Sequence, residues 1–419
     1  MSHFAVITPP LYSHLHAMQA LAQVLIARGH KITFIQPASA VATVSDEHIA
    51  VQYVGAANTT MLERAGKPGE ISLFSLIGQM SRTTEMLCRE LPDALTRLGV
   101  DGLIVDQMEA AGGLVAEALG LPFVSVACAL PVNRETGLPL PVMPFDYATD
   151  KRALKLYDTS SRIYDWLMRS HDRTIARNAA KFGLAPRKSL DQCLSPLAQI
   201  SQTVPLLDFP RQALPACFHH VGPLRSTKAV STESAWPVSP SRPFVFASLG
   251  TLQGHRFRLF KTIAHACRSL DVQLLIAHCG GLNARQADAL LASGANWVTD
   301  FADQQQVLQQ AQAVITHGGL NTVVDAVNSA TPILAVPVAF DQPGVAARVA
   351  WNGLGRRVCR FSTSNTMAQN LNLLLNDEGY PRRLAAARQQ LQQAGGALRA
   401  ADIIEQAFKI QPARLEAAG

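Results

Sequence analysis

The chain lacks the sequence features of membrane-spanning and nucleic-acid-binding proteins. No stretch of about 18 uncharged apolar residues occurs in its 419 positions, so we expect no membrane-spanning helix. No run dense in Lys and Arg alternates with aromatic residues, although the formal net charge at pH 7 is +6 and the pI is near 9.0. The positive charge therefore favours an acidic small-molecule substrate or an anionic surface over nucleic acid.

Paired cysteines are also absent. The seven cysteines lie at positions 88, 128, 193, 217, 267, 279 and 359, and none forms a C-x-x-C pair. This spacing argues against a zinc site and a disulfide scaffold, and it predicts reduced, mostly buried thiols in a cytoplasmic protein. The opening letters MSHFAVITPPLYSH contain no charged segment followed by a long apolar one, so they predict a first strand and not a signal peptide.

What the chain does contain favours a large folded core. Hydrophobic residues make up 48% and charged residues 16% of the sequence, which disfavours disorder. At roughly 100–200 residues per domain, the length predicts two domains. No low-complexity tract or short repeat interrupts the chain.

Apolar periodicity alternates between strand and helix along the chain. Residues 4–8 predict a strand, 15–28 a helix and 31–36 a second strand, which is the opening of a doubly wound sheet. A Ser-, Thr- and Pro-rich stretch precedes a second series of the same kind. We therefore predict a first domain at 1–221, a linker at 222–243, a second domain at 244–385, and a C-terminal helix and tail at 386–419 that return to the first domain.

The most informative segment spans residues 301–342. A short strand at 313–316 ends in the letters His-Gly-Gly at 317–319, where the glycines let the backbone approach a ligand closely. Asn321 and Thr322 then begin a helix, whose free N–H groups and dipole favour a bound phosphate. This strand–turn–helix arrangement predicts an anion site at the carboxyl edge of the second sheet.

Four side chains of the same segment suit the remaining parts of a nucleotide sugar. His317 can donate to a phosphate oxygen, and Asp325, about one helical turn on, can accept hydrogen bonds from a ribose. Asp341 and Gln342 follow another strand and can bond sugar hydroxyls. Each feature has an ordinary alternative, namely a tight turn, a packing or capping histidine, or a solvated helix cap. The combined spacing favours the donor site.

This combination resembles the donor-binding signature of the UDP-glycosyltransferase family. The letters F-A-D-Q (301–304), T-H-G-G-L-N-T (316–322) and F-D-Q (340–342) carry the resemblance, together with S-L-G-T (248–251). It implies the GT-B fold, in which two Rossmann-like domains have parallel sheets that face each other across an interdomain cleft, and a UDP-sugar donor. The implied donor-binding residues are Ser248, Gly250, Thr251, Phe301, Gln304, His317, Gly319, Asn321, Thr322, Asp325, Asp341 and Gln342.

The resemblance also assigns parts of the donor to these residues. It places Gln304 at the uracil and ribose, His317 on the diphosphate, and Asp325 on the ribose, while Asp341 and Gln342 meet the sugar. The chain departs from the family pattern in three places. Phe301 stands where an indole stacks on uracil, Asp303 replaces a proline, and Asp325 replaces a glutamate.

A histidine and an aspartate suit the chemistry of sugar transfer. Such transfer needs a base that removes the proton of the attacking hydroxyl, and a neutral histidine oriented by a carboxylate suits this at pH 7. His14 is expected just before the first helix, whose N-terminus disfavours the charged ring, and Asp106 ends the strand G-L-I-V-D. Both lie at the carboxyl edge of one sheet. Both residues could instead be helix caps, and His16 is a rival base, but the family pattern matches His14, with Ser13 replacing its glycine.

The acceptor is indicated by resemblance alone. The segments V-D-Q-M-E-A-A-G (105–112), V-A-C-A-L-P-V-N-R-E (126–135), I-Y-D-W-L-M-R (163–169) and F-A-S-L-G-T-L-Q-G-H (246–255) resemble bacterial glucosyltransferases of carotenoid synthesis. This implies inverting transfer from UDP-glucose to each terminal ring hydroxyl of a hydrophobic carotenoid, giving a mono- and then a diglucoside. The alternatives are a macrolide, polyketide or sterol acceptor, a UDP-sugar epimerase, or a non-catalytic partner of the same fold.

Two further expectations concern metals and membranes. No metal-ligand spacing occurs in the chain, so we expect no divalent metal and no cofactor beyond UDP-glucose as co-substrate. Residues 151–190 hold ten Lys or Arg and three Asp, with Tyr157, Tyr164 and Trp166 among them. This pattern suggests peripheral contact with lipid at the cytoplasmic face of the membrane. The alternative is an amphipathic helix with its aromatic residues turned inward.

Overall fold

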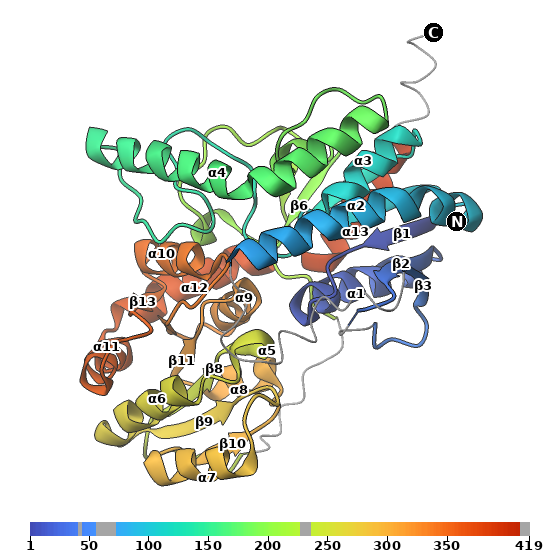
Figure 1. Cartoon of the computed structure of the whole chain (residues 1–419). Helices are drawn as coiled ribbons and strands as arrows, with labels where there is room; N and C mark the ends of the chain where they lie inside the picture. The colour runs from blue at the N-terminus through green and yellow to red at the C-terminus, as the bar shows by residue number, and fades with distance from the viewer. Residues whose placement is uncertain (41–43, 56–72, 227–235, 411–419) are drawn as a thin grey trace.

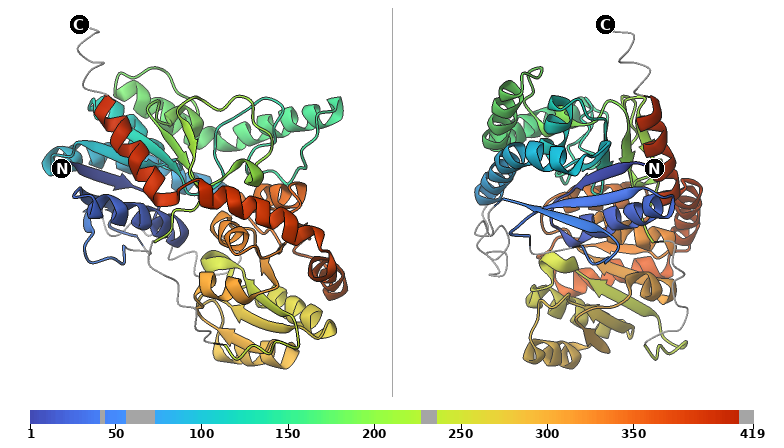
Figure 2. Two further views of the ribbon diagram at one scale, coloured as in Figure 1. Left: turned by 180° about the vertical axis from the view of Figure 1, so that it is seen from behind. Right: turned by 90° about the vertical axis from the view of Figure 1, so that its right-hand side faces the viewer.

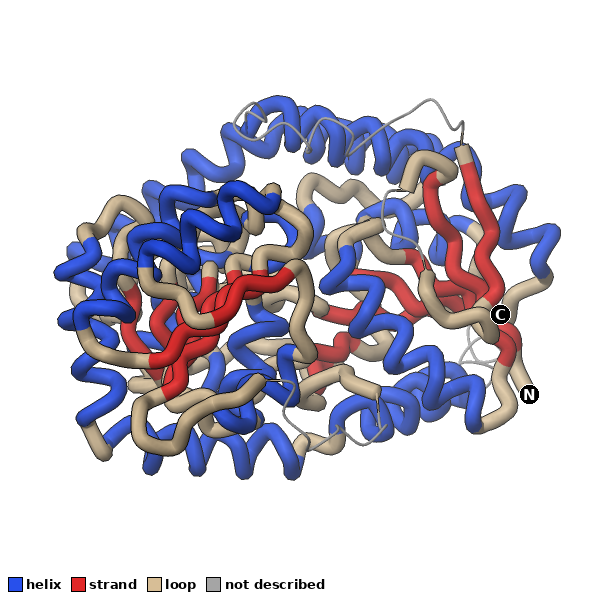
Figure 3. Tube along the Cα trace, turned by 90° about the horizontal axis from the view of Figure 1, so that it is seen from below, coloured by secondary structure: helices blue, strands red, loops and turns tan. Residues whose placement is uncertain are grey.

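A computed structural model describes residues 1–40, 44–55, 73–226 and 236–410. Figure 1 shows two α/β units that follow one another along the chain. Seven parallel strands form the sheet of the first unit and six form that of the second. Figure 3 shows both sheets flanked by helices. The predicted α/β fold with two parallel sheets is therefore confirmed.

The first sheet has the order β3-β2-β1-β4-β5-β6-β7. Its strands are β1 (His3–Ile7), β2 (Lys31–Pro37), β3 (Ala50–Val54), β4 (Gly102–Asp106), β5 (Phe123–Ala127), β6 (Gln199–Ser201) and β7 (Phe218–His220). Every residue of β4 and β5 is buried, as expected for strands whose sheet is covered by helices on both faces.

Helices cover the two faces of the first sheet with different apolar clusters. On one face, α1 (Tyr12–Ala27) and α13 (Gly396–Ile410) pack together against the strands. On the other face lie α2 (Leu73–Leu98), α3 (Ala110–Ala118) and α4 (Lys151–Lys181). Figure 2 shows α13, in red, on the side opposite α2 and α4.

The second sheet has the order β10-β9-β8-β11-β12-β13. Its strands are β8 (Phe244–Ser248), β9 (Gln273–Ala277), β10 (Trp297–Thr299), β11 (Ala313–Thr316), β12 (Ile333–Ala335) and β13 (Gly355–Arg357). The helices of this unit are α5 (Gly250–Gln253), α6 (Phe257–Ser269), α7 (Ala284–Ser293), α8 (Gln304–Gln310), α9 (Leu320–Asn328), α10 (Gln342–Trp351), α11 (Ser364–Asn376) and α12 (Gly379–Gln393).

In each sheet the strand order reverses beside the segments that carry the predicted site residues. In the first sheet β1 pairs with β4, with Ile7 opposite Val105. In the second, β8 pairs with β11, with Ser248 opposite Thr316. Connections leave such a switch point in opposite directions, which opens the carboxyl edge to ligands. The loops after β1, β4, β8 and β11 therefore hold the positions where a doubly wound sheet binds substrates.

The C-terminal segment differs from the sequence-based expectation. The sequence predicted one C-terminal helix within residues 386–419, but the chain bends at Gly395 and Gly396, which both have positive φ. Helix α12 packs into the core of the second unit, and α13 packs on the first. The domain limit predicted at residue 385 thus falls inside α12, and the crossing occurs at the two glycines. Residues 227–235 of the predicted linker and 411–419 of the tail lie outside the described residues.

Two simpler expectations can also be compared with the structure. All seven cysteines are free, and four of them are buried. Within the described ranges, no helix combines the length and the apolar character needed to cross a bilayer.

Candidate active site

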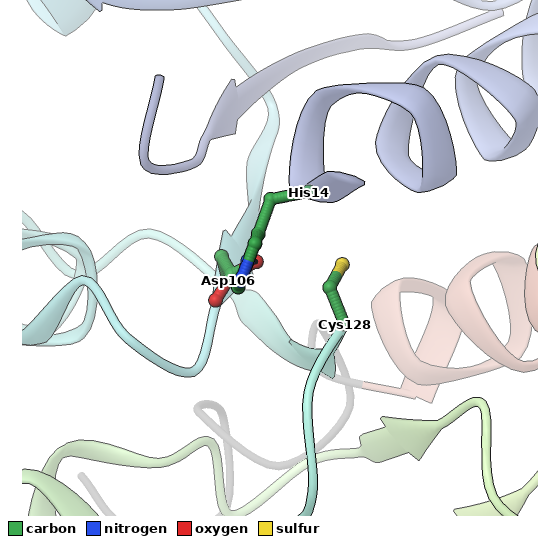
Figure 4. Close-up of side chains that lie close together, drawn as sticks. All are labelled: His14, Asp106 and Cys128. Atoms are coloured by element: carbon green, nitrogen blue, oxygen red, sulfur yellow. Dashed lines mark hydrogen bonds and ion pairs between the residues drawn. The ribbon is translucent and has the colours of Figure 1, made fainter. Parts of the chain in front are cut away.

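His14 and Asp106 form a direct, buried contact at the carboxyl edge of the first sheet. Nδ1 of His14 lies 2.7 Å from Oδ2 of Asp106, and Figure 4 shows the two side chains pointing toward each other. The sequence analysis placed His14 just before the first helix. Helix α1 in fact begins at Tyr12, so His14 lies in its first turn. The His14 side chain is 10% exposed and that of Asp106 is fully buried. The parallel pairing of β1 with β4 brings the two residues together.

Neighbouring groups hold the Asp106 carboxylate in place. The Met108 backbone N–H donates to Oδ1 over 2.9 Å, and the Thr8 hydroxyl donates to Oδ2 over 3.4 Å. The Cys128 sulfur lies within 4.8 Å of the nearest polar atoms of His14 and Asp106, and burial together with Asp106 raises the pKa of its thiol well above the usual range. These hydrogen bonds fix the orientation of the carboxylate. The spacing argument considered cysteines only as pairs and therefore missed Cys128.

The charge of Asp106 controls the protonation of His14. Burial opposes a charged ring, but Asp106 outweighs it, so the pKa of His14 is raised above its ordinary value. The sequence analysis expected the N-terminus of α1 to disfavour the charged ring, but the contact with Asp106 acts in the opposite direction and the net shift of the pKa is upward. A proton on Nδ1 that is donated to Asp106 leaves the lone pair on Nε2. Nε2 is then the atom that can accept a proton from a substrate.

A further carboxyl group lies near this pair and was not found from the sequence. Glu109 is buried at the start of α3. Burial and the neighbouring Asp106 raise its pKa to about 8, so it is largely protonated at neutral pH. Its position three residues after Asp106 matches no motif used in the sequence analysis, so it was not selected there.

On the donor side, His317 is enclosed by two glycines. A Cβ atom added to Gly250 would lie 2.6 Å from Cε1 of His317, and one added to Gly319 would lie 2.6 Å from Nε2. Gly250 also has a φ of +70°. Burial lowers the pKa of His317 to about 4, so the ring is neutral at pH 7 and one nitrogen can donate a hydrogen bond. Gly250 and Gly319 thus leave room for the His317 ring, and the close approach of the backbone to a ligand stays a prediction.

The acid and amide side chains that were predicted to contact the nucleoside form hydrogen bonds with one another. Nε2 of Gln304 donates to Oδ2 of Asp325 over 2.7 Å, and the Thr322 hydroxyl donates to Oε1 of Gln304 over 3.1 Å. Arg225 also contacts this group, with its Nε 2.7 Å from Oδ1 of Asp325. Its position inside a stretch that was predicted to be a linker hid it from the sequence analysis.

The two predicted half-sites meet at the domain interface. Nδ2 of Asn321 donates to the backbone oxygen of Ser13 over 3.0 Å. The Leu130 backbone N–H donates to Oδ2 of Asp341 over 3.3 Å. The Asp341 carboxylate also contributes to the raised pKa of His14. The structure therefore brings the proposed sugar-binding acid beside the proposed base, with direct interdomain contacts where the sequence predicted a cleft.

Other predicted residues take different positions. Phe301 is 64% exposed, and Thr251 is also exposed. The Ser248 hydroxyl accepts from the Gly250 backbone N–H over 3.3 Å and so supports the loop. Oε1 of Gln342 accepts from the backbone N–H groups of residues 338 and 339, which engages the oxygen predicted to face the sugar.

The ring of the rival base His16 stacks on that of Tyr12, and charged residues of the donor side influence its pKa. Burial and the charge of Arg225 lower its pKa, while Asp325 acts in the opposite direction. These neighbours belong to the predicted nucleoside group, whereas the carboxylate of Asp106 contacts His14. The structure therefore separates the two histidines and favours His14 as the base.

One group of described residues has metal-ligating atoms close together. A nitrogen of His14, an oxygen of Asp106 and the sulfur of Cys128 all lie within 4.8 Å of one another. The set does not fit an ion well. The His14 nitrogen already bonds directly to the carboxylate, and the thiol has a strongly raised pKa, whereas metals bind thiolates.

Comparisons with known proteins agree with this geometry. The zeaxanthin glucosyltransferase of Pantoea ananas is 57% identical over 413 residues, which cover 97% of this chain and 96% of that enzyme. The enzyme of the same name from Pseudescherichia vulneris is 56% identical over 410 residues, covering 97% and 98%.

Solved structures show the same fold at low sequence identity. The glycotransferase of kitacinnamycin superimposes with a TM-score of 0.77 at 20% identity, covering 97% of this chain and 99% of that one. The calicheamicin glycosyltransferase CalG4 gives a TM-score of 0.75 at 19% identity, covering 98% and 99%. A model of the family described as UDP-glucoronosyl and UDP-glucosyl transferase matches residues 5–386. The chain is therefore a glycosyltransferase of the GT-B fold and belongs to the UDP-glucoronosyl and UDP-glucosyl transferase family.

Proposed function

We propose that this protein transfers glucose from UDP-glucose to the hydroxyl groups of zeaxanthin, forming first the mono- and then the diglucoside. The observation that carries the transfer chemistry is the 2.7 Å contact between His14 and Asp106, beside Asp341 of the donor domain. The choice of acceptor is supported by the two zeaxanthin glucosyltransferases that are more than half identical to this chain along nearly its full length.

The proposed reaction is a single displacement. Nε2 of His14 accepts the proton of the acceptor hydroxyl while the oxygen forms a bond to the anomeric carbon. The bond from that carbon to the β-phosphate oxygen breaks, and UDP leaves with the electron pair. Asp106 stabilises the imidazolium that forms. Because the nucleophile enters opposite the leaving group, the anomeric configuration inverts.

The donor domain stabilises the leaving group in this proposal. Neutral His317 donates to the diphosphate, and the first turn of α9 supplies backbone N–H groups, since its N-cap Gly319 has no side chain to occupy them. Asp325 and Gln304 bind the nucleoside, Phe301 stacks on the uracil, and Asp341 binds the sugar. We also propose that no divalent metal takes part, because these groups meet the diphosphate charge.

An acceptor panel tests the proposed function. Purified protein is incubated with UDP-glucose and zeaxanthin, and separately with β-carotene, a sterol and a macrolide, with and without EDTA. We expect glucosides of zeaxanthin, no product from β-carotene because it lacks a hydroxyl, and an unchanged rate in EDTA. Glucosylation of the sterol or macrolide without any of zeaxanthin would contradict the acceptor, and a rate that EDTA abolishes and magnesium restores would contradict metal independence.

We further propose that the protein contacts the cytoplasmic face of the membrane through the outer side of α4. Lys155, Arg162, Trp166 and Arg173 are all exposed and follow one another at intervals of seven, four and seven residues. This spacing places them on one face of the helix. Trp166 is 59% exposed, and Ile163 beside this row is 55% exposed. Figure 1 shows α4 along the outside of the first unit.

Two acidic residues of α4 have basic partners. Asp158 pairs with Arg162 of the exposed row over 2.9 Å, and Asp165 pairs with Arg134 of a neighbouring loop over 2.7 Å. With three basic residues against this one acidic partner, the exposed row keeps a net positive charge, and it carries the aromatic side chain of Trp166. This combination suits an anionic lipid surface, which is where an enzyme would collect a carotenoid.

A further inference from the structure

Arg225 is a buried cation in a part of the chain whose composition predicts a linker. Its side chain is only 11% exposed. It follows the last strand of the first sheet by five residues and lies between the two domains, in contact with both. Burying a guanidinium is costly unless its charge and its donors are matched, so the environment of this residue must compensate for it.

The donor-binding helix α9 provides most of that compensation. Nε of Arg225 donates to Oδ1 of Asp325 over 2.7 Å. Nη2 donates to both the backbone oxygen and Oδ1 of Asn321, each over 3.1 Å. A planar guanidinium thus holds two residues one turn apart on the same helix, which the single ammonium group of a lysine cannot reproduce.

The remaining donors of Arg225 face the first domain. Nη1 donates to Oε1 of Gln202 over 3.0 Å and to the backbone oxygen of Leu224 over 2.9 Å. All five N–H groups of the guanidinium therefore have acceptors. Gln202 is fully buried, and its Nε2 donates to Oδ1 of Asn321 over 3.1 Å and to the backbone oxygen of Cys128 over 3.3 Å.

These contacts join the two halves of the site. The Cys128 sulfur lies within 4.8 Å of the nearest polar atoms of His14 and Asp106, while Asp325 accepts from Gln304 on its second carboxylate oxygen. Arg225 and Gln304 together fix both oxygens of Asp325. A chain of hydrogen bonds therefore runs from the backbone of Cys128, beside the acid–base pair, through Gln202 and Arg225 to the nucleoside-binding group.

We propose that Arg225 is a positioning residue for the nucleotide sugar. It orients Asn321 and Asp325 for the UDP moiety, and through Gln202 it ties that orientation to the closed arrangement of the two domains. This inference rests on the proposed donor role of Asn321 and Asp325. It predicts that replacing Arg225 weakens binding of the donor more than it slows the chemical step.

The test compares Arg225→Met and Arg225→Lys in the full-length protein. UDP affinity is measured by calorimetry without acceptor, and KM for UDP-glucose and kcat are measured with zeaxanthin. We expect the Kd for UDP and the KM to rise about 10- to 100-fold in Arg225→Met, as for loss of charge-assisted bonds to buried partners, with a smaller change in kcat. Arg225→Lys keeps the positive charge but loses the planar guanidinium group. Its Kd for UDP should therefore lie between those of the wild type and Arg225→Met.

Arg242→Met is the matched control. Arg242 lies in the same predicted linker and pairs with Asp271 of the same domain over 3.2 Å, but both side chains are exposed, at 40% and 82%. An exposed pair contributes little, so UDP affinity should stay at the wild-type value. The double variant Arg225→Met/Asp325→Asn should bind UDP only slightly more weakly than Asp325→Asn, because the two residues act as one unit.

The outcomes separate this inference from the proposed function. If wild-type protein binds UDP and Arg225→Lys and Arg225→Met bind it within about twofold of wild type, the positioning role is wrong while the donor assignment stands. An effect confined to kcat would also overturn it. If the wild-type protein does not bind UDP, the proposed donor and this inference both fail. Should Arg225→Met not fold, Arg225→Lys and the double variant still decide the question.

Discussion

At the scale of single residues, the site combines groups whose chemistry the sequence indicates with groups that only tertiary contacts reveal. His14 and Asp106 could be paired in advance because His14 follows β1, Asp106 is the last residue of β4, and both strands end at one sheet edge. Cys128 could not be placed there, because its position near Asp106 depends on how the chain turns after β5. Arg225 is the clearest case. The local composition predicted a linker, whereas the contact between the two domains buries the side chain of this residue.

The pH dependence of kcat/KM tests the coupling between His14 and Asp106. His14 acts as a base only when neutral, and its pKa is raised, so activity should fall as the pH drops through that raised value. Asp106→Asn removes the negative charge, so the acidic limb should move to lower pH. The plateau should also fall by roughly 10²–10⁴-fold, the range for a damaged acid–base group.

Glu109→Gln serves as the control for that profile. Glu109 is largely protonated at neutral pH and has the smallest of the effects that raise the pKa of His14. The acidic limb of Glu109→Gln should therefore shift less than that of Asp106→Asn. An Asp106→Asn limb that stays at the wild-type pH would show that Asp106 does not set the protonation of the base.

The glycine turn around His317 allows a steric prediction. Gly250→Ala adds a Cβ 2.6 Å from the His317 ring at a φ of +70°, so the ring or the loop must move. We expect the KM for UDP-glucose to rise at least about tenfold, by loss of one phosphate hydrogen bond. Gly280→Ala is the matched control, because Gly280 has a φ of +72° but no atom within 4 Å of the added Cβ. Equal KM values for the two variants would contradict a role for His317 in donor binding.

At the scale of elements, helices and strands could be predicted where the apolar pattern extends over many residues. The residues at which they begin and end could not. The residues of α4 show both outcomes. Tyr157 is buried, as the inward-facing alternative predicts, whereas Trp166 is exposed, as the membrane hypothesis requires. The break between α12 and α13 had a signal in the two adjacent glycines at 395 and 396, but the apolar periodicity continues across them.

Vesicle co-sedimentation tests the proposed membrane face of α4. Wild-type protein should sediment with vesicles that contain anionic lipid at low salt, and less at high salt, with each basic residue contributing up to about 1 kcal/mol. The double variant Arg162→Glu/Arg173→Glu should lose this binding. Arg382→Glu/Arg388→Glu makes the same charge change on exposed positions of α12 and should retain it. Identical sedimentation of all three proteins would remove the membrane proposal and leave the transferase assignment intact.

At the scale of the whole molecule, two similar sheets present their switch points to each other. The sequence predicted both sheets, because strand and helix patterns repeat on either side of a Ser- and Pro-rich stretch. It did not predict how the domains touch, because the contacts Asn321–Ser13 and Asp341–Leu130 use the backbone of one partner. The same contacts bring Asp341 beside His14, which gives the paired domains a single site.

The central claim is that His14 removes the acceptor proton in a reaction between UDP-glucose and zeaxanthin. The most direct measurement is the rate of zeaxanthin glucoside formation by His14→Ala, followed by chromatography, with the Kd for UDP determined on the same preparation. We predict a rate about 10²–10⁴-fold below wild type with UDP affinity unchanged, because the base acts on the acceptor and not on the nucleotide. A folded His14→Ala protein that forms the glucoside at the wild-type rate would contradict the account.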